Sequence, residues 1–267
     1  MQLSISHSTI YKFKRSPSYG LQQLRLTPKS NKGQTTLDWS LEVTGGEIQV
    51  DFLDENANRV HLVAIDPNST EIEIKSSGTL DIENNHGVIG AQKSFAPLWY
   101  FHRQTPLTEP KAGVKSLLNE LGDDLQDPVA GFHALSKLIG AKVNYETGET
   151  DSVTTAEEAI ALGKGVCQDH AHIFISAARE AGFPARYVSG YLMMNDRIDQ
   201  DATHAWAEVH IPSLGWVGFD VSNGISPDDR YVRIATGLDY SQAAPVSGMI
   251  YGGGGESLRV DIQVQQQ

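Results

Sequence analysis

The chain has 267 residues, of which 40% are hydrophobic, and its formal net charge is −12. Such a chain is long enough to form one large or two smaller soluble domains with sizeable cores. The negative charge argues against sequence-independent nucleic-acid binding, which requires a positive surface facing the phosphates. No apolar run reaches the ~20 residues that span a bilayer, and the N-terminus lacks the pattern of a signal peptide. We therefore expect a cytoplasmic protein with no membrane or nucleic-acid partner.

The first part of the chain has the pattern of β-strands. Up to about residue 90, short alternating runs are separated by clusters of glycine, asparagine, proline and serine, as in a sandwich or a strongly bent sheet. The pattern then becomes helical and later returns to strands. The helical segments are 112–123, 127–143 and 154–165, and the later strand segments are 185–193, 203–211, 215–222 and 257–265. We therefore predict an α+β fold with an N-terminal all-β, sandwich-like domain at 1–95 and a catalytic α+β domain at 96–267 that includes the C-terminal strands.

Two local patterns support this interpretation. Thr154 or Thr155, with Glu157 or Glu158 three residues later, resembles the capping box that begins a helix. Four glycines at 252–255 are expected to form a flexible turn, because they lack the spacing and the following helix of a phosphate loop.

The stretch GKGVCQDHAH, from Gly163 to His172, contains the only cysteine of the chain. A period of ~100° per residue from Cys167 predicts an amphipathic helix, which Gly182 and Pro184 end. Its apolar face comprises Ala171, Ile173, Phe174, Ile175, Ala177, Ala178 and Ala181, and its polar face Gln168, Asp169, His172, Ser176, Arg179 and Glu180. Cys167 would then face inward at the helix N-terminus, where unpaired N–H groups and the macrodipole favour a nucleophilic thiolate. The alternative is a small, inert core residue.

A nucleophilic cysteine needs a base, and the base needs a group that orients it. THAWAEVHI and GWVGFDVS are predicted to form a hairpin that supplies both. If residues 210–214 form a five-residue loop, Val209 pairs with Gly215. His204 then stands opposite Asp220, with Cβ atoms ~5 Å apart. A four-residue loop would put the two side chains on opposite faces of the hairpin.

Three further residues are candidates for the wall of a cleft around this site. The alternation along each strand places Trp206 on the face of His204 and Trp216 on the face of Asp220. Core packing explains both tryptophans equally well. His170 lies ~60° around the helix from Cys167, and we expect it to be packed and hydrogen-bonded rather than to act directly.

The same helix allows a second hypothesis, a metal site. Cys167, His170 and His172 form the pattern C-x2-H-x-H, and zinc sites use these side chains. His204 and His210 are further potential ligands. However, His170 and His172 differ by ~160° around one helix, so both cannot easily reach one ion together with the cysteine. We therefore expect no metal and no cofactor.

Longer stretches of the sequence carry a resemblance to a known family. GKGVCQDHAHIFISAAREAGFPARYVSGYL contains the cysteine, and DATHAWAEVHIPSLGWVGFDVSNG contains the histidine and the aspartate. Both resemble the corresponding blocks of the transglutaminase-like superfamily, in the family's order. HSTIYKFKRSPSYGLQQLRLTP looks like the β-rich N-terminal module of the bacterial branch, and GLDYSQAAPVSGMIYGGGGESLRVDIQV resembles its C-terminal strand region. The resemblance covers essentially the whole chain.

This resemblance implies a papain-like α+β core and acyl transfer through a thioester, with Cys167, His204 and Asp220 in the triad positions. Bacterial members are often called transglutaminase-like peptidases, so we expect a cysteine peptidase or amidase whose partner is a peptide or another amide-bearing substrate. The alternatives are a protein-glutamine transamidase, another Cys–His–Asp acyltransferase such as an arylamine acetyltransferase, and a binding module with a vestigial triad.

The sequence departs from the family's patterns at two positions. His170 stands where similar proteins more often carry an aromatic or aliphatic residue. Ala161, six residues before Cys167, stands where papain's pattern has an oxyanion-hole glutamine. The backbone N–H of Cys167 is one expected donor to the oxyanion. The second donor, the oligomeric state and the role of the N-terminal domain are left open.

Overall fold

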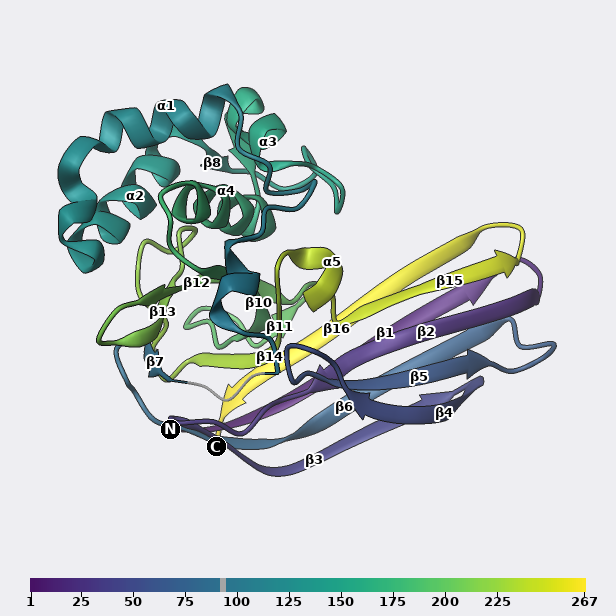
Figure 1. Ribbon diagram of the computed structural model, residues 1–267. Helices are drawn as coiled ribbons and strands as arrows, with labels where there is room; N and C mark the ends of the chain where they lie inside the picture. Colours follow the sequence, from purple (N-terminus) through teal and green to yellow (C-terminus); the bar gives the residue numbers. More distant parts are fainter. Residues whose placement is uncertain (92–94) are drawn as a thin grey trace.

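A computed structural model of the protein describes residues 1–91 and 95–267 (Figure 1). Long strands form a two-sheet sandwich, and a second unit packs helices against a five-stranded sheet. The predicted fold class, a β-sandwich-like region joined to an α+β core, is confirmed. Residues 92–94, just before the predicted domain boundary, lie outside the described residues.

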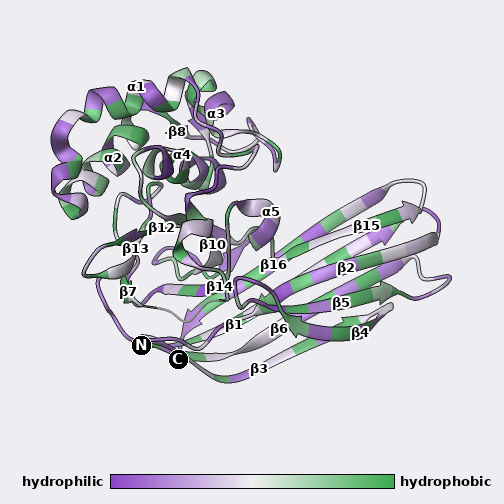
Figure 2. Ribbon diagram, in the orientation of Figure 1, coloured by the Kyte–Doolittle hydropathy of each residue, from purple (hydrophilic) through white to green (hydrophobic). Residues whose placement is uncertain are grey.

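The sandwich consists of one sheet in the order β11-β16-β1-β6-β3 and another in the order β15-β2-β5-β4. Its strands are β1 (Gln2–Phe13), β2 (Pro17–Thr27), β3 (Gln34–Thr44), β4 (Gly46–Leu53), β5 (Arg59–Ile65), β6 (Glu71–Ile82), β11 (Asp199–Gln200), β15 (Val246–Gly252) and β16 (Glu256–Gln266). Hydrophobic and hydrophilic bands alternate along several of these strands in Figure 2, as expected where one face of a sheet is buried. Leu24, Val63 and Ile74 are among the residues that fill the core.

The C-terminal strands belong to this sandwich. β16 pairs with β1 along its length, from Leu3 opposite Gln266 to Phe13 opposite Glu256, and β15 pairs with β2. The two chain ends therefore lie together in Figure 1, and the backbone N–H of Gln267 donates to the Gln2 carbonyl at 3.1 Å. The prediction that these strands form part of the catalytic domain is wrong, because strand alternation identifies a strand but not its neighbour.

The core sheet has the order β14-β10-β12-β13-β7. Its strands are β7 (Val88–Gly90), β10 (Ala185–Leu192), β12 (His204–Ile211), β13 (Gly215–Phe219) and β14 (Tyr231–Gly237). The helix α4 (Cys167–Glu180) packs against β10 and β12, and Tyr191, Val232 and Ile234 join the core sheet to the sandwich. β7 pairs with β13 although it falls in the predicted N-terminal domain, so that domain assignment is also corrected here.

Three further helices pack around α4: α1 (Ala112–Leu121), α2 (Pro128–Lys142) and α3 (Ala156–Leu162). Thr155 and Glu158 form the predicted capping box at the start of α3. The short elements are η1 (Leu98–His102), η2 (Gly122–Gln126), α5 (Tyr240–Ala243) and the paired strands β8 (Asn144–Tyr145) and β9 (Lys164–Gly165). In the part of the chain that the structure describes, no helix has the length and apolar character that crossing a membrane requires.

The helix α4 is buried on nearly all sides, which the amphipathic pattern did not predict. Asp169, His172, Ser176 and Arg179 of its polar face are each less than 5% exposed. The reason is that the core sheet and the other helices enclose α4, so several of its polar side chains bond to protein instead of water. The guanidinium of Arg179, for example, donates to three backbone carbonyls, those of Phe101, Ala185 and Leu238.

The hairpin of β12 and β13 has a different register from the predicted one. Val209 pairs with Val217, and the last pair is Ile211 with Gly215, which leaves a three-residue loop. Ser213 and Gly215 adopt left-handed φ values of 74° and 79°, which make this tight turn possible. The predicted five-residue loop and the pairing of Val209 with Gly215 are therefore wrong. The shift is two residues, so every side chain keeps its predicted face.

A buried ionic cluster lies on the core sheet where it meets the sandwich. The carboxylate of Glu208 is fully buried and pairs with the guanidinium groups of Arg186 and Arg233. Gln34, from β3 of the sandwich, donates to the Arg233 carbonyl and accepts from its N–H, both at 2.8 Å. These bonds fix β3 of the sandwich to β14 of the core sheet.

Candidate active site

Cys167 begins α4 directly after a tight entry. Gly163 adopts a left-handed φ of 69°, and a Cβ on Gly165 would stand 2.8 Å from the Asp169 side chain. The Asp169 carboxylate accepts from the Val166 N–H and the Thr150 hydroxyl, both at 2.7 Å. These contacts hold the chain just ahead of the nucleophile, and the cysteine itself is partly exposed. This partial exposure distinguishes it from a fully buried core residue.

His204 lies between Cys167 and Asp220. Its Nε2–H donates to Oδ2 of Asp220 at 2.7 Å, and its ring lines the same pocket as Cys167, close enough for a charge on the sulfur to act on it. Because Nε2 is bonded to the aspartate, Nδ1 is the nitrogen that is available to the sulfur. The structure thus brings the three predicted residues together in the order of a nucleophile, a base and an orienting carboxylate.

The electrostatics of this arrangement favour a protonated His204. Burial by itself lowers the pKa of His204, but the hydrogen bonds with Asp220 and Cys167 and their negative charges outweigh it and raise the pKa to about 10. Burial likewise raises the pKa of Asp220, but its hydrogen bonds and the His204 charge bring it below the usual value. A proton on the imidazole is therefore stable beside the Asp220 carboxylate.

Asp220 is held by two residues that the sequence reasoning missed. Tyr231, from β14, donates its hydroxyl to Oδ2 at 2.7 Å. The Nδ2 of Asn223 donates to the same oxygen at 2.7 Å, and its backbone N–H donates to Oδ1 at 3.3 Å. Asn223 follows the aspartate by three residues, so an Asx-type turn in DVSNG was a usable signal. Nothing in the spacing pointed to Tyr231, which comes from a different strand.

The site opens into a pocket of about 660 Å³. Cys167 and His204 lie in its wall, together with many uncharged polar side chains. The other lining residues are Tyr145, Thr147, Val166, Gln168, Tyr187, Met194, Arg197, Gln200, Asp201, Ala202, Thr203, Ala205, Ser222, Asn223 and Tyr240. Hydroxyl and amide groups of this kind can hydrogen-bond the backbone of a peptide or a carboxamide.

The three residues predicted to line the cleft do not line it. Trp206 is 3% exposed and packs edge-on against Tyr231, with ring centres 5.4 Å apart. Trp216 is equally buried under the guanidinium of Arg186, 3.9 Å from the ring centre. The hairpin face that carries both tryptophans is covered by other parts of the chain, so both are core residues. The predicted role of Trp206, Trp216 and His170 as the cleft wall is therefore wrong.

His170 is packed and hydrogen-bonded, as expected. Its Nε2–H donates to the Val143 carbonyl at 2.9 Å, and its Nδ1 accepts from the Ser222 hydroxyl at 2.9 Å. Burial lowers its pKa, which suits a neutral ring that donates with one nitrogen and accepts with the other. Through these two bonds His170 links α4, near the nucleophile, to Val143 and Ser222.

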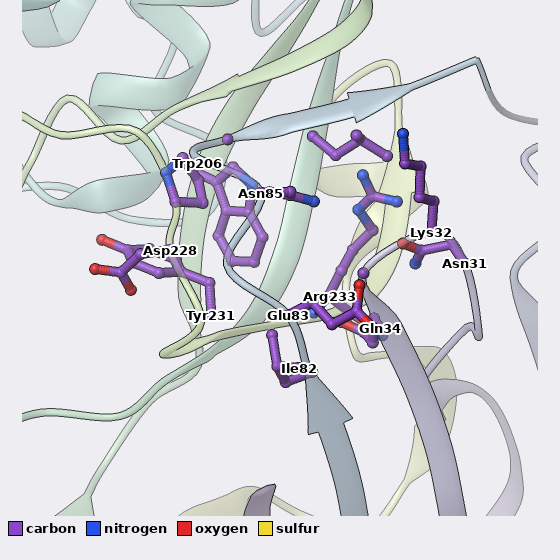
Figure 3. A pocket seen from close by; sticks show the side chains of 14 residues that line it. Asn31, Lys32, Gln34, Ile82, Glu83, Asn85, Trp206, Asp228, Tyr231 and Arg233 are labelled. Atoms are coloured by element: carbon purple, nitrogen blue, oxygen red, sulfur yellow. The ribbon is translucent and has the colours of Figure 1, made fainter. Parts of the chain in front are cut away.

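Figure 3 shows a second, small pocket of about 40 Å³ where the core sheet meets the sandwich. Trp206, Tyr231 and Arg233 of the core line it, opposite Gln34 and Ile82 of the sandwich. Tyr231 therefore reaches from this junction to the carboxylate of the candidate triad.

Comparisons with known proteins agree with this architecture. Residues 115–221 match the family model of the transglutaminase-like superfamily, and residues 3–81 match that of the bacterial transglutaminase-like N-terminal region. An uncharacterized protein of Mycobacterium leprae is 25% identical over 276 residues, which cover 98% of each chain. An uncharacterized protein of Mycobacterium tuberculosis is 37% identical over 140 residues, 49% of this chain and 44% of that protein.

A solved structure shares the fold. It is a proposed cysteine protease of Cytophaga hutchinsonii, 23% identical, with a TM-score of 0.77 over 99% of this chain and 90% of that one. The likeness thus includes the sandwich as well as the core. The superfamily match spans all three candidate triad residues.

Proposed function

The chain joins a transglutaminase-like core to a bacterial transglutaminase-like N-terminal region, and from this we propose that it cleaves amide bonds through a thioester on Cys167, as a peptidase or amidase. The observation that carries the proposal is the position of His204, which is hydrogen-bonded to Asp220 and lines the same pocket as Cys167, whose charge acts on its ring. A buried imidazole with a raised pKa between a carboxylate and a thiol is what a thiolate nucleophile requires.

The first half of the reaction forms the thioester. The sulfur of Cys167 bonds to the carbonyl carbon, and the π electrons of the carbonyl move to its oxygen. The N–H groups of the first turn of α4 have no partner within the helix, so that of Cys167 can donate to this oxyanion. The carbon–nitrogen bond then breaks, and the leaving amine takes the proton from Nδ1 of His204.

The second half releases the acyl group. His204, now neutral, removes a proton from the incoming water, and the resulting oxygen nucleophile attacks the thioester carbonyl. The thiolate leaves as the imidazolium forms again, with Asp220 stabilising its charge. Water as acceptor is supported by the site itself, because the partly exposed cysteine lies in a pocket of about 660 Å³ with a polar wall.

A generic acyl donor tests the proposal without knowledge of the natural substrate. We expect p-nitrophenyl acetate to give a burst of nitrophenol, an acetyl group on Cys167 in intact mass spectra, and then steady release of acetate. The matched variant Cys167→Ala removes the nucleophile and is expected to lose the burst and the adduct. The side chain is small and partly exposed, so the fold should survive.

The outcomes separate the alternatives. Adding glycinamide as a competing acceptor and obtaining mainly acetylglycinamide would identify a transamidase. Nitrophenol release no faster than in Cys167→Ala would overturn the proposal and favour a binding module with an inactive triad.

A further inference from the structure

Tyr145 is held beside the nucleophile by backbone pairing. The short strands β8 and β9 run parallel, with Tyr145 in register with Gly165, two residues before Cys167. Hydrogen bonds on both sides of Tyr145 fix this pairing: the N–H of Asn144 donates to the Gly163 carbonyl at 2.9 Å, and that of Glu146 to the Gly165 carbonyl at 2.8 Å. The segment that leads into α4 therefore also positions the tyrosine.

The side chain of Tyr145 lies beside the nucleophile. Its hydroxyl is close enough to Cys167 for a negative charge on the sulfur to act on it, and its ring lies edge-on to His170, with ring centres 6.2 Å apart. It lines the same pocket as Cys167 and His204. Tyr145 is 54% exposed, so its ring is not part of the hydrophobic core.

Burial of the hydroxyl, together with the negative charges of Cys167 and Asp220, raises the pKa of Tyr145 to about 12. The phenol therefore keeps its proton at neutral pH. It acts as a hydrogen-bond donor to a neighbouring negative charge and not as an acid or a base.

We propose that Tyr145 is a catalytic residue whose hydroxyl is the second donor to the oxyanion. This inference rests on the proposed function of Cys167. In the tetrahedral intermediate the oxyanion is two bonds from the sulfur, so a donor within reach of the sulfur is also within reach of that oxygen. The side chain of Ala161, at the position suggested by papain's pattern, has no group that could donate.

The role of Tyr145 requires no reactant beyond those of the proposed reaction. When the sulfur–carbon bond forms, charge moves from the sulfur to the carbonyl oxygen. The Tyr145 hydroxyl then donates to this oxygen and keeps its own proton. When the carbon–nitrogen bond breaks, the carbonyl re-forms, and the leaving amine takes its proton from His204. The hydroxyl thus binds the transition state more strongly than the neutral carbonyl of the substrate.

Two reactions of Cys167 distinguish a donor to the oxyanion from a group that only changes the reactivity of the thiolate. Iodoacetamide is attacked at a saturated carbon, so no oxyanion forms, whereas p-nitrophenyl acetate is attacked at a carbonyl. In Tyr145→Phe we expect the acylation rate constant to fall by about 10²–10³, the loss typical for one oxyanion-hole donor. We expect the alkylation rate constant to change by less than about threefold, because that transition state has no developing oxyanion.

Tyr251→Phe is the matched control, because Tyr251 is 73% exposed on β15 of the sandwich and lies outside the site. We expect it to leave both rate constants unchanged. Equal losses in both reactions of Tyr145→Phe, or no loss in either, would overturn the inference while wild-type acylation of Cys167 keeps the proposed function intact. A wild-type protein that is not acylated at Cys167 would overturn both.

Discussion

His204 and Asp220 are joined by a 2.7 Å hydrogen bond although they are not a pair in the hairpin that carries them. The ladder ends where Ala207 pairs with Phe219, so Asp220 lies just beyond β13. Its backbone instead pairs with Ile225, and its carboxylate is held by Asn223 and Tyr231. The orientation of the aspartate therefore depends on these donors more than on the sheet.

Asp220→Asn should reduce acyl transfer by about two to four orders of magnitude while the fold survives. The amide cannot stabilise an imidazolium, and it favours the wrong tautomer of His204. The measurement is the burst rate constant with p-nitrophenyl acetate. Asp261→Asn, at an exposed ion pair on β16, is the control and should leave that rate constant unchanged. Full activity of Asp220→Asn would show that the aspartate does not orient the base.

Tyr231→Phe should weaken both the site and the fold. It removes a hydroxyl bound to a buried carboxylate, which typically lowers the free energy of unfolding by about 1.5–3 kcal/mol. With one donor fewer, Asp220 becomes more basic and holds the His204 proton more tightly. The alkaline limb of the activity profile should therefore move to higher pH. Urea unfolding and a pH–rate profile check the two effects; a variant unchanged in both would contradict this positioning role.

The raised pKa of His204 also predicts how stability depends on pH. The folded protein binds this proton more tightly than the unfolded chain, whose value is near 6.5, because the folded pKa is about 10. The resulting stabilisation is fully present below pH 6.5 and is lost as the pH rises through about 10. Urea unfolding across this range should show the decline.

The contribution of this one histidine can be isolated by substitution. In His204→Gln the decline in stability between neutral and alkaline pH should become smaller, whereas His102→Gln, at an exposed position, should retain it. If the stability of His204→Gln fell with pH as steeply as that of the wild type, the proton on this histidine would not stabilise the fold.

Glu208→Gln should strongly destabilise the protein. The substitution leaves the buried guanidinium groups of Arg186 and Arg233 without their carboxylate, and breaking a buried ion pair on one side typically costs about 3–5 kcal/mol. Thermal unfolding measures the loss. Glu71→Gln breaks the surface pair with Lys12 and should cost about 1 kcal/mol or less. Similar effects of the two substitutions would show that the cluster does not fasten the core sheet.

The sequence was sufficient to predict the three residues at the centre of the site. The helical period placed Cys167 at the start of a helix. A period of two placed His204 and Asp220 on one face of the hairpin, although the predicted register was two residues off. These are local patterns, and an error of two residues does not change the face of a strand.

Contacts between distant segments could not be predicted in this way. Tyr145 and Tyr231 reach the site from β8 and β14, and no spacing along the chain relates them to the triad. The pairing of β16 with β1 joins the two ends of the chain for the same reason. The polar face of α4 was recognised, but a helical period does not show whether water or protein covers that face.

The alkylation rate of Cys167 tests the central claim most directly, because the chain has no other cysteine. It is measured with iodoacetamide from about pH 4 to 10, in the wild type and in His204→Ala. The account predicts a rate that is already high below pH 7 in the wild type and is lost in the variant, as expected for a thiolate held by the imidazolium. A single rise near pH ~8.5, where an ordinary free thiol ionises, with the same profile in both proteins, would contradict it.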